Sequence, residues 1–169
     1  RRAISIDQKN DEFKKILGLI LLKRYDFKNA WSFFDGRLGL TDFANKNSEL
    51  KLVKNKIPNE NTLNQNSKIL ILREQGVGDE LLYGTMYFDL LNRFSDLVIE
   101  CDERLIPLFK NSFESHKDKF VKLGTHSLDT NKIKSFNYVI YAGSLGKYFR
   151  NNLNSFSQSP YMKSFKNYK

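Results

Sequence analysis

The chain has 169 residues, of which 40% are hydrophobic and 28% are charged, a composition typical of soluble globular proteins. Its longest apolar run, Ile16 to Leu22, is much shorter than the roughly 18 residues that a membrane span requires, so we expect no transmembrane segment. The single cysteine, Cys101, cannot form an internal disulfide, which favours a reducing compartment and a cytoplasmic location. Because Cys101 follows the apolar run 97–99, we expect a buried strand thiol.

The net charge of +9 is spread along the chain. Residues 1–67 contain 13 basic and 8 acidic side chains, and residues 68–169 contain 15 and 11. Lys far outnumbers Arg and Asn is abundant, a bias that an AT-rich genome produces without selection for a polyanion. No basic stripe stands out, so the sequence predicts no nucleic-acid partner.

The first 44 residues predict a helical hairpin. Asp11 is the expected N-cap of the first helix, and Lys23 and Arg24 suit its carboxyl end. Asp26 is the expected cap of the second helix, which should end near Gly36 and Gly39. Apolar side chains recur at helical spacing in both: Phe13, Ile16, Leu17, Ile20 and Leu21, then Phe27, Ala30, Trp31 and Phe34.

This hairpin also matches the packing positions of a tetratricopeptide repeat (TPR) at Leu17-Gly18, Leu21, Ala30 and Phe34. Small Gly18 and Ala30 would let the helices approach closely, and Phe34 would fill the space beside them. One hairpin cannot bury both of its faces. The hairpin is therefore expected to end an array or to pack on the domain that follows.

Residues 45–67 are polar and predict a connector with about one extended or helical turn. Residues 68–169 predict a Rossmann-like α/β domain with a parallel sheet, because short apolar runs alternate with helical patterns. The segment 69–72 should be its central strand, buried on both faces. The expected strands are 68–73, 96–100, 119–123 and 137–141, and the expected helices are 80–94 and 103–111.

Two loops should lie at the carboxyl ends of strands, where open parallel sheets bind ligands: residues 74–80 and 143–146. Gly76 and Gly78 permit positive φ and close approach of a ligand to the backbone. Asp79, at or near a helix N-cap, is a candidate general base for a sugar hydroxyl. The alternative is that Asp79 only caps its helix and the glycines only turn the chain.

No nucleotide-binding fingerprint accompanies this loop. The third glycine of a dinucleotide motif and the Gly-Lys-Ser/Thr of a phosphate-binding loop are both absent, and we expect no cofactor. His116 and His126 lie in polar surroundings without a sequence-near nucleophile, so both are interpreted as surface residues. With one cysteine and two histidines, no metal site is expected.

The stretch Arg73-Glu74-Gln75-Gly76-Val77-Gly78-Asp79-Glu80-Leu81 resembles the first βαβ of glycosyltransferase-like domains attached to bacterial TPR proteins, which are similar to heptosyltransferases. Ser144-Leu145, Pro160-Tyr161-Met162 and the helix from Trp31 to Arg37 extend the resemblance over most of the chain in the right order. The sequence departs from the family at Gly146, where Pro is usual, and in lacking a Trp-Gly element in the connector.

The resemblance implies a GT-B architecture whose N-terminal half is this chain. The general base then falls on Asp79, and the acceptor side is lined by Glu74, Gln75, Gly76, Gly78, Glu80 and Ser144. A nucleotide-sugar donor would be held by a second domain, so we interpret the chain as a fragment that is inactive alone. The alternative function is a non-catalytic interaction module that binds a protein partner through the helical hairpin.

Overall fold

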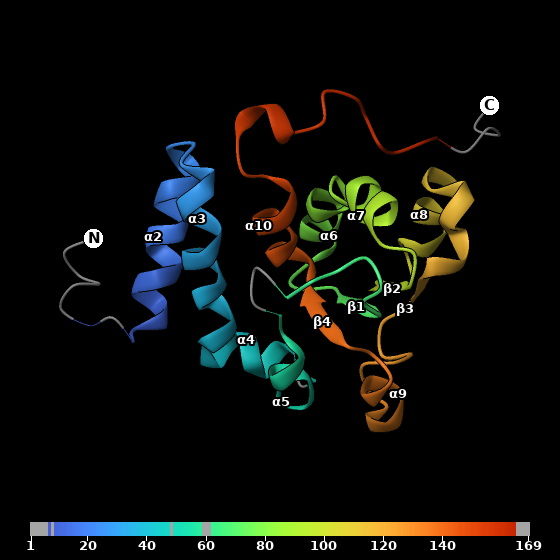
Figure 1. The fold of residues 1–169 in the computed structure, drawn as a ribbon, viewed down its shortest axis with the longest axis horizontal. Helices are drawn as coiled ribbons and strands as arrows, with labels where there is room; N and C mark the ends of the chain where they lie inside the picture. The colour runs from blue at the N-terminus through green and yellow to red at the C-terminus, as the bar shows by residue number, and fades with distance from the viewer. Residues whose placement is uncertain (1–6, 8, 48, 59–61, 165–169) are drawn as a thin grey trace. The chain divides into compact units, whose positions relative to one another are not determined.

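The computed structural model describes residues 7, 9–47, 49–58 and 62–164. The fold is mixed α/β with a four-stranded parallel sheet (Figure 1). Contacts divide the chain into a helical unit, Arg1–Lys51 with Ser144–Phe156, and a sheet unit, Leu52–Gly143 with Ser157–Lys169. The predicted segments 1–44, 45–67 and 68–169 thus differ from the units of the structure, because residues 144–156 belong with the helices.

The helical unit is built on a hairpin of α2 (Asp11–Lys23) and α3 (Phe27–Phe34). The N-cap of α2 is Asn10 and not the predicted Asp11, because the Asn10 side chain accepts a hydrogen bond from Phe13 N–H. Asp26 is the N-cap of α3 as predicted, although its side chain makes no capping bond there.

The turn between the two helices is a Schellman motif. Tyr25 N–H donates to Leu22 C=O and Asp26 N–H donates to Leu21 C=O, both at 3.0 Å. Tyr25 has φ 61° at the position where glycine is usual, so this tight turn retains local backbone strain.

The two helices pack at Gly18 as expected from the sequence. A Cβ on Gly18 would lie 2.4 Å from the backbone nitrogen of Phe34, so only glycine permits this approach. Leu17, Leu21 and Ala30 form the buried centre of the hairpin. The predicted buried stripe is wrong at Phe13, Ile16 and Ile20, which are exposed because α3 covers only the opposite side of α2.

Segment 144–156 joins this unit through α10 (Gly146–Phe149). The indole Nε1–H of Trp31 donates to Arg150 C=O at 2.7 Å. A Cβ on Gly146 would lie 2.5 Å from the Trp31 ring, so glycine here makes room for the indole. After α3 the chain continues with η1 (Asp35–Gly39) and α4 (Thr41–Lys46). The predicted connector 45–67 is more helical than expected, with α5 (Leu50–Val53) and η2 (Lys54–Lys56) in succession.

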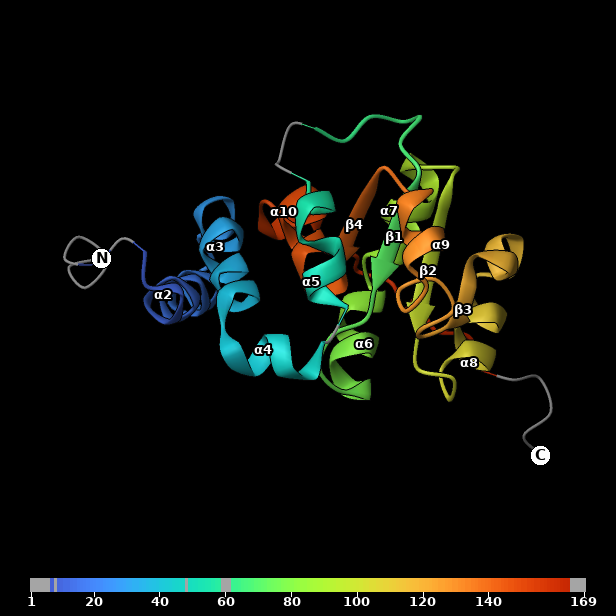
Figure 2. The same cartoon turned by 90° about the horizontal axis from the view of Figure 1, so that it is seen from below.

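The sheet has the strand order β3-β2-β1-β4, and Figure 2 shows these strands side by side. Its strands are β1 (Ile69–Leu72), β2 (Leu97–Cys101), β3 (Phe120–Lys122) and β4 (Tyr138–Tyr141). All pairings are parallel, with Ile69 opposite Leu97 on one side and Tyr138 on the other. The prediction that 69–72 form a central strand buried on both faces is confirmed.

Helices cover both faces of the sheet: α7 (Tyr87–Arg93) and α8 (Ile106–Ser112) lie on one side and α9 (Thr130–Lys134) on the other (Figures 1 and 2). The short remaining elements are η3 (Glu114–Lys119), η4 (Ala142–Leu145) and η5 (Leu153–Ser155). A cluster of aromatic rings fills the core under α7 and α8: Tyr87, Phe109, Phe113 and Phe120.

The predicted helix 80–94 is two helices. α6 (Val77–Gly84) starts three residues earlier, and α7 follows after a break at Thr85 and Met86. In α6 the Leu82 side chain is 63% exposed. Gly84 is buried beside Tyr161, whose hydroxyl donates to Leu81 C=O at 2.6 Å and ties segment 157–164 to α6.

Candidate functional site

The order β3-β2-β1-β4 creates a topological switch between β1 and β4. From β1 the chain first adds β2 and β3 on one side and then returns to the other side with β4. Open parallel sheets bind ligands at the carboxyl ends of the strands at such a point. The loop 74–76 and the first turn of α6 lie there, after β1, and Gly143 lies there, after β4.

Glu74 connects these two loops. Its side chain is 1% exposed, and its Oε1 accepts a short hydrogen bond from the backbone N–H of Gly143. A buried carboxylate is stable only where donors satisfy it. Glu74 therefore fixes the distance between the ends of β1 and β4 from inside the sheet unit.

The backbone of the β1–α6 loop differs from the prediction. Positive φ occurs at Gln75, with φ 61°, and neither Gly76 nor Gly78 has a positive φ. A Cβ on Gly78 would meet no atom within 4 Å, and one on Gly76 would approach only the Asp79 carboxylate, at 3.7 Å. Neither backbone conformation nor packing requires glycine at these two positions.

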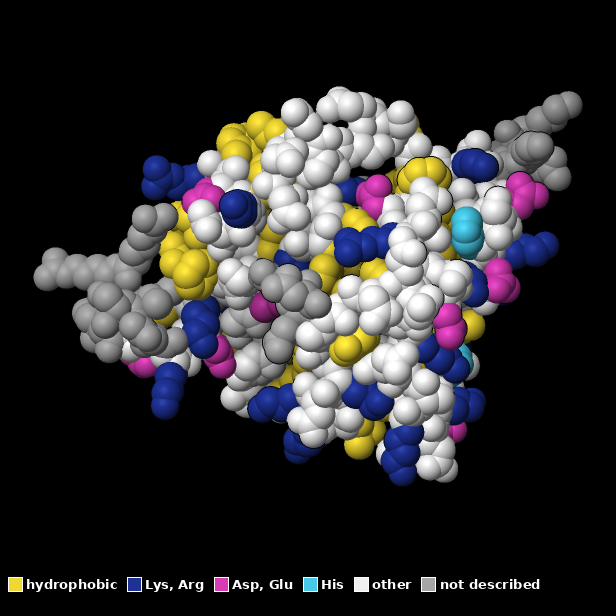
Figure 3. Space-filling model, viewed as in Figure 1, with side chains coloured by type: hydrophobic (Ala, Val, Ile, Leu, Met, Phe, Trp, Pro, Cys, Tyr) yellow, Lys and Arg dark blue, Asp and Glu magenta, His cyan; other side chains and the backbone are white. Residues whose placement is uncertain are grey.

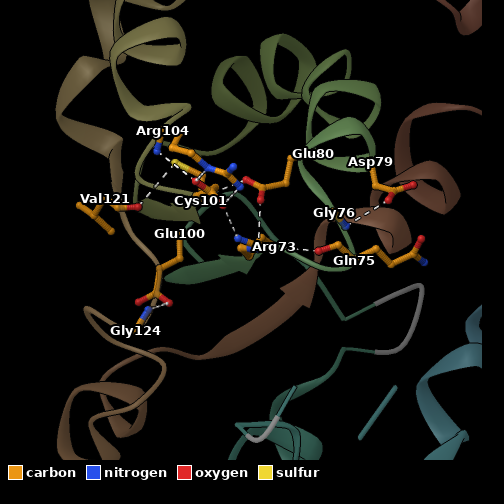
Figure 4. Close-up of polar contacts among 11 residues, drawn as sticks. Arg73, Gln75, Gly76, Asp79, Glu80, Glu100, Cys101, Arg104, Val121 and Gly124 are labelled. Atoms are coloured by element: carbon orange, nitrogen blue, oxygen red, sulfur yellow. Dashed lines mark hydrogen bonds and ion pairs between the residues drawn. The ribbon is translucent and has the colours of Figure 1, made fainter. Parts of the chain in front are cut away.

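Asp79 is the third residue of α6 and is half-buried. Its Oδ2 accepts a hydrogen bond from Gly76 N–H at 3.1 Å, which caps the helix (Figure 4). Among the described residues nothing donates to Oδ1, the other carboxylate oxygen. Asp79 thus has a capping role through one oxygen and keeps a second oxygen available to a ligand.

Glu80 lies beside Asp79 in the sequence but is fully buried on the other side of α6. Its Oε2 accepts from Asp102 N–H at 2.9 Å, and its Oε1 lies 3.0 Å from Arg73 Nε without hydrogen-bond alignment. Burial raises the pKa of Glu80, while the hydrogen bond from Asp102 and the Arg73 charge act in the opposite direction.

Arg73 contacts residues at the carboxyl ends of both β1 and β2 (Figure 4). Its guanidinium donates to Gln75 C=O at 2.8 Å and to Asp102 Oδ2 at 2.9 Å. Asp102 also accepts from Arg104, and the hydrogen bonds from Arg104 hold the Asp102 pKa well below its usual range. Arg73 therefore stabilises the strained Gln75 conformation through the carbonyl oxygen of that residue.

Sequence reasoning missed Arg73 and Asp102 as parts of this site. The available signal was position alone, because each is the first charged residue after a buried strand. Cys101 is a buried thiol, as predicted, and burial raises its pKa to about 12, so it stays protonated at neutral pH.

Ser144, the remaining predicted site residue, belongs to the helical unit. Its hydroxyl donates to Asp35 Oδ1 at 2.6 Å and accepts from Arg37 Nη2 at 3.0 Å. Lys147 Nζ lies 2.8 Å from Asp35 Oδ2 and completes a partly buried ion network. These contacts attach segment 144–156 to the end of α3.

A third buried carboxylate is structural. Glu100 of β2 is fully buried and accepts hydrogen bonds from Gly124 N–H, Ser127 N–H and the Ser127 hydroxyl. It organises the loop that follows β3, in which Gly124 has φ 86°. Because donors surround both of its oxygens, Glu100 is not part of the candidate site.

No protein-family model, curated protein or solved structure matches this chain. In the part of the chain that the structure describes, no helix combines the length and apolar character needed to cross a membrane. Nor do the described residues include a group of three or more His, Cys, Asp or Glu side chains placed to hold a metal ion.

Proposed function

We propose that the sheet unit is a Rossmann-like half of a GT-B glycosyltransferase that holds a sugar acceptor, with Asp79 as general base. The main support for this proposal is the arrangement of glycines in the β1–α6 loop. Glycine is absent at residue 75, where the backbone would favour it, and present at residues 76 and 78, where folding does not require it. Glycine within a helix costs about 0.5–1 kcal/mol relative to alanine, a cost that applies to Gly78 in α6 and not to Gly76 at the N-cap. An uncovered backbone at Gly78 and a free carboxylate oxygen at Asp79 fit a ligand that approaches closely.

In this proposal the buried carboxylates Glu74 and Glu80 position the loop. The contacts with the sugar come from the loop residues Gln75, Gly76, Gly78 and Asp79. Glu74 holds the ends of β1 and β4 together, and Glu80 with Arg73 holds α6 against β2. A base at Asp79 Oδ1 would accept the proton of the attacking sugar hydroxyl while Oδ2 stays bonded to Gly76. The nucleotide-sugar donor is assigned to a second domain.

We also propose that the α2–α3 hairpin is TPR-like. Gly18 and Ala30 occupy the small-residue positions of that repeat. The support is that Gly18 lies against the Phe34 backbone and that Ala30 is fully buried.

Acceptor binding is tested with the 169-residue chain and simple methyl hexosides and heptosides, followed by two-dimensional NMR. We expect amide shifts in residues 74–80, and at least about tenfold weaker binding for Gly78→Leu, whose side chain would project into the open space at the loop. Asp96→Asn, an exposed carboxylate just before the amino end of β2, is the matched control and should bind as the parent does. Unchanged binding by Gly78→Leu contradicts the site and favours the non-catalytic module.

The base assignment is tested by turnover in the presence of the donor domain. Asp79→Asn keeps the shape and a capping oxygen, and removal of a general base lowers the rate by about 10²–10⁴-fold. Turnover within about threefold of the parent would leave Asp79 as a helix cap only.

A further inference from the structure

One side of α2 is apolar and exposed. Leu17, Gly18 and Leu21 are buried in the hairpin, whereas Phe13, Ile16, Leu19 and Ile20 are 37–49% exposed. Their spacing of three and four residues places these four side chains along one side of the helix, and Figure 3 shows hydrophobic side chains on the surface over α2 and α3. We call these four residues the outer stripe.

Opposite charges stand at the two ends of the outer stripe. Glu12 is in the first turn of α2 and Lys23 is in the last. Glu12 is four residues before Ile16 and Lys23 is four residues after Leu19. Each charge therefore lies about one helical turn beyond the stripe, on the same side of the helix. Glu12 has a contact with Lys15, but this pair is exposed and 3.4 Å long, the kind of ion pair that contributes little.

We propose that the outer stripe is a self-association surface on which α2 pairs antiparallel with α2 of a second copy of the chain. In this register, Glu12 faces Lys23 of the second copy and Ile16 faces its Leu19. A two-fold axis near the middle of the helix repeats each contact, as an isologous interface requires. The charge pattern is complementary to itself only in the antiparallel arrangement, which favours a second copy over an unrelated partner.

The surface is small, so the association is expected to be weak and reversible. It does not involve the β1–α6 loop, and it stands or fails independently of the sugar-transfer proposal. Sugar binding by the same variants, measured as above, should stay unchanged.

Sedimentation equilibrium of the 169-residue chain over concentrations up to about 1 mM should show a monomer–dimer equilibrium. Ile16→Asp should weaken it by on the order of a hundredfold, because each dimer loses two apolar contacts near its axis. Leu82→Asp, which introduces the same charge at an exposed leucine of α6, is the control and should leave it unchanged. A chain that stays monomeric at every concentration, or equal weakening by Leu82→Asp, overturns the proposal.

Charge reversal tests the register. Glu12→Lys and Lys23→Glu each replace two attractive pairs by two repulsive ones, so each variant should self-associate about tenfold more weakly. When the two variants are mixed, both contacts of the heterodimer become attractive, and association should recover. Because both substitutions oppose the helix dipole in every state, helix destabilisation cannot explain recovery on mixing. Absence of a heterodimer between variants that circular dichroism shows to be folded refutes the antiparallel pairing.

Discussion

At the scale of single residues, two non-glycine residues in the described part of the chain adopt a left-handed backbone conformation that glycine adopts without strain: Tyr25 and Gln75, both with φ 61°. Tyr25 closes the turn between α2 and α3, where the Schellman hydrogen bonds impose the conformation. Gln75 lies in the candidate site, where Arg73 bonds to its carbonyl oxygen. The same strain therefore has a local structural reason at Tyr25 and a proposed functional one at Gln75.

The first prediction compares these two positions. Gln75→Gly and Tyr25→Gly should each raise the free energy of unfolding by about 0.5–1 kcal/mol, because the strain removed exceeds the entropy cost of glycine. Urea denaturation checks both values. Only Gln75→Gly should weaken sugar binding, and equal binding by the two variants would argue that Gln75 is strained for folding alone.

Asp35 is the centre of the ion network in the helical unit. Burial by itself would raise the Asp35 pKa, but the charges of Arg37 and Lys147, with hydrogen bonds from Lys147 and Ser144, outweigh burial and hold it below the usual value. A carboxyl group with a lowered folded-state pKa stabilises the fold above its unfolded-state pKa. That contribution is lost as the pH falls from about 4 through the folded-state pKa.

The second prediction follows from the lowered pKa of Asp35, which makes its ionised form stabilising. Asp35→Asn should lower the free energy of unfolding at pH 7 by about 1–3 kcal/mol, because it removes the negative charge that pairs with Arg37 and Lys147. Below about pH 4 the difference between variant and parent should shrink. Chemical denaturation at both pH values measures it, with the exposed Asp42→Asn as a control for loss of a carboxylate. A difference that stays constant with pH would contradict the role of the ionised form.

At the scale of elements, close packing depends on a few glycines whose missing side chains make room for a neighbour. Gly18 accommodates the backbone of Phe34, Gly146 accommodates the Trp31 indole and Gly84 accommodates the Tyr161 hydroxyl. Each contact joins segments that are distant in sequence. Gly78 differs from all three, because nothing occupies the space that its side chain would fill.

The third prediction uses this contrast. Gly18→Ala should destabilise the protein by about 1–3 kcal/mol, because a new methyl group would overlap backbone atoms that cannot rotate away. Gly78→Ala should stabilise it by about 0.5–1 kcal/mol, because alanine favours the helix and meets no atom. Thermal unfolding of the two variants gives both signs in one experiment, and destabilisation by Gly78→Ala would show that folding selects this glycine.

At the scale of the whole molecule, the proposal gives the candidate site an acceptor side and a base, and it assigns the donor to a second domain. Catalysis of transfer requires donor and acceptor in near-attack geometry. The fourth prediction is that the purified 169-residue chain transfers no sugar from any nucleotide sugar to a hexoside or heptoside. Chromatography of products after prolonged incubation checks this, and any transfer above a protein-free blank refutes it.

The sequence by itself determined the elements whose signal is periodic. An unbroken apolar run predicted the central strand 69–72, because a strand covered on both faces is mostly apolar, and strands alternating with helices predicted a parallel sheet. The small residue at Gly18 predicted close contact in the hairpin for a similar reason. The loop after β1 was also located from the sequence, since a strand, two glycines and a helix follow one another there.

Only the tertiary structure decided which side of each helix is covered and which polar groups meet. Periodicity gave α2 one broad apolar face, but α3 covers only Leu17, Gly18 and Leu21, and the outer stripe remains exposed. The positive φ at Gln75 and the inward orientation of Glu74 and Glu80 depend on partners at Gly143, Asp102 and Arg73. The Glu74–Gly143 and Glu80–Asp102 contacts join residues far apart in sequence, and local pattern contains no information about them.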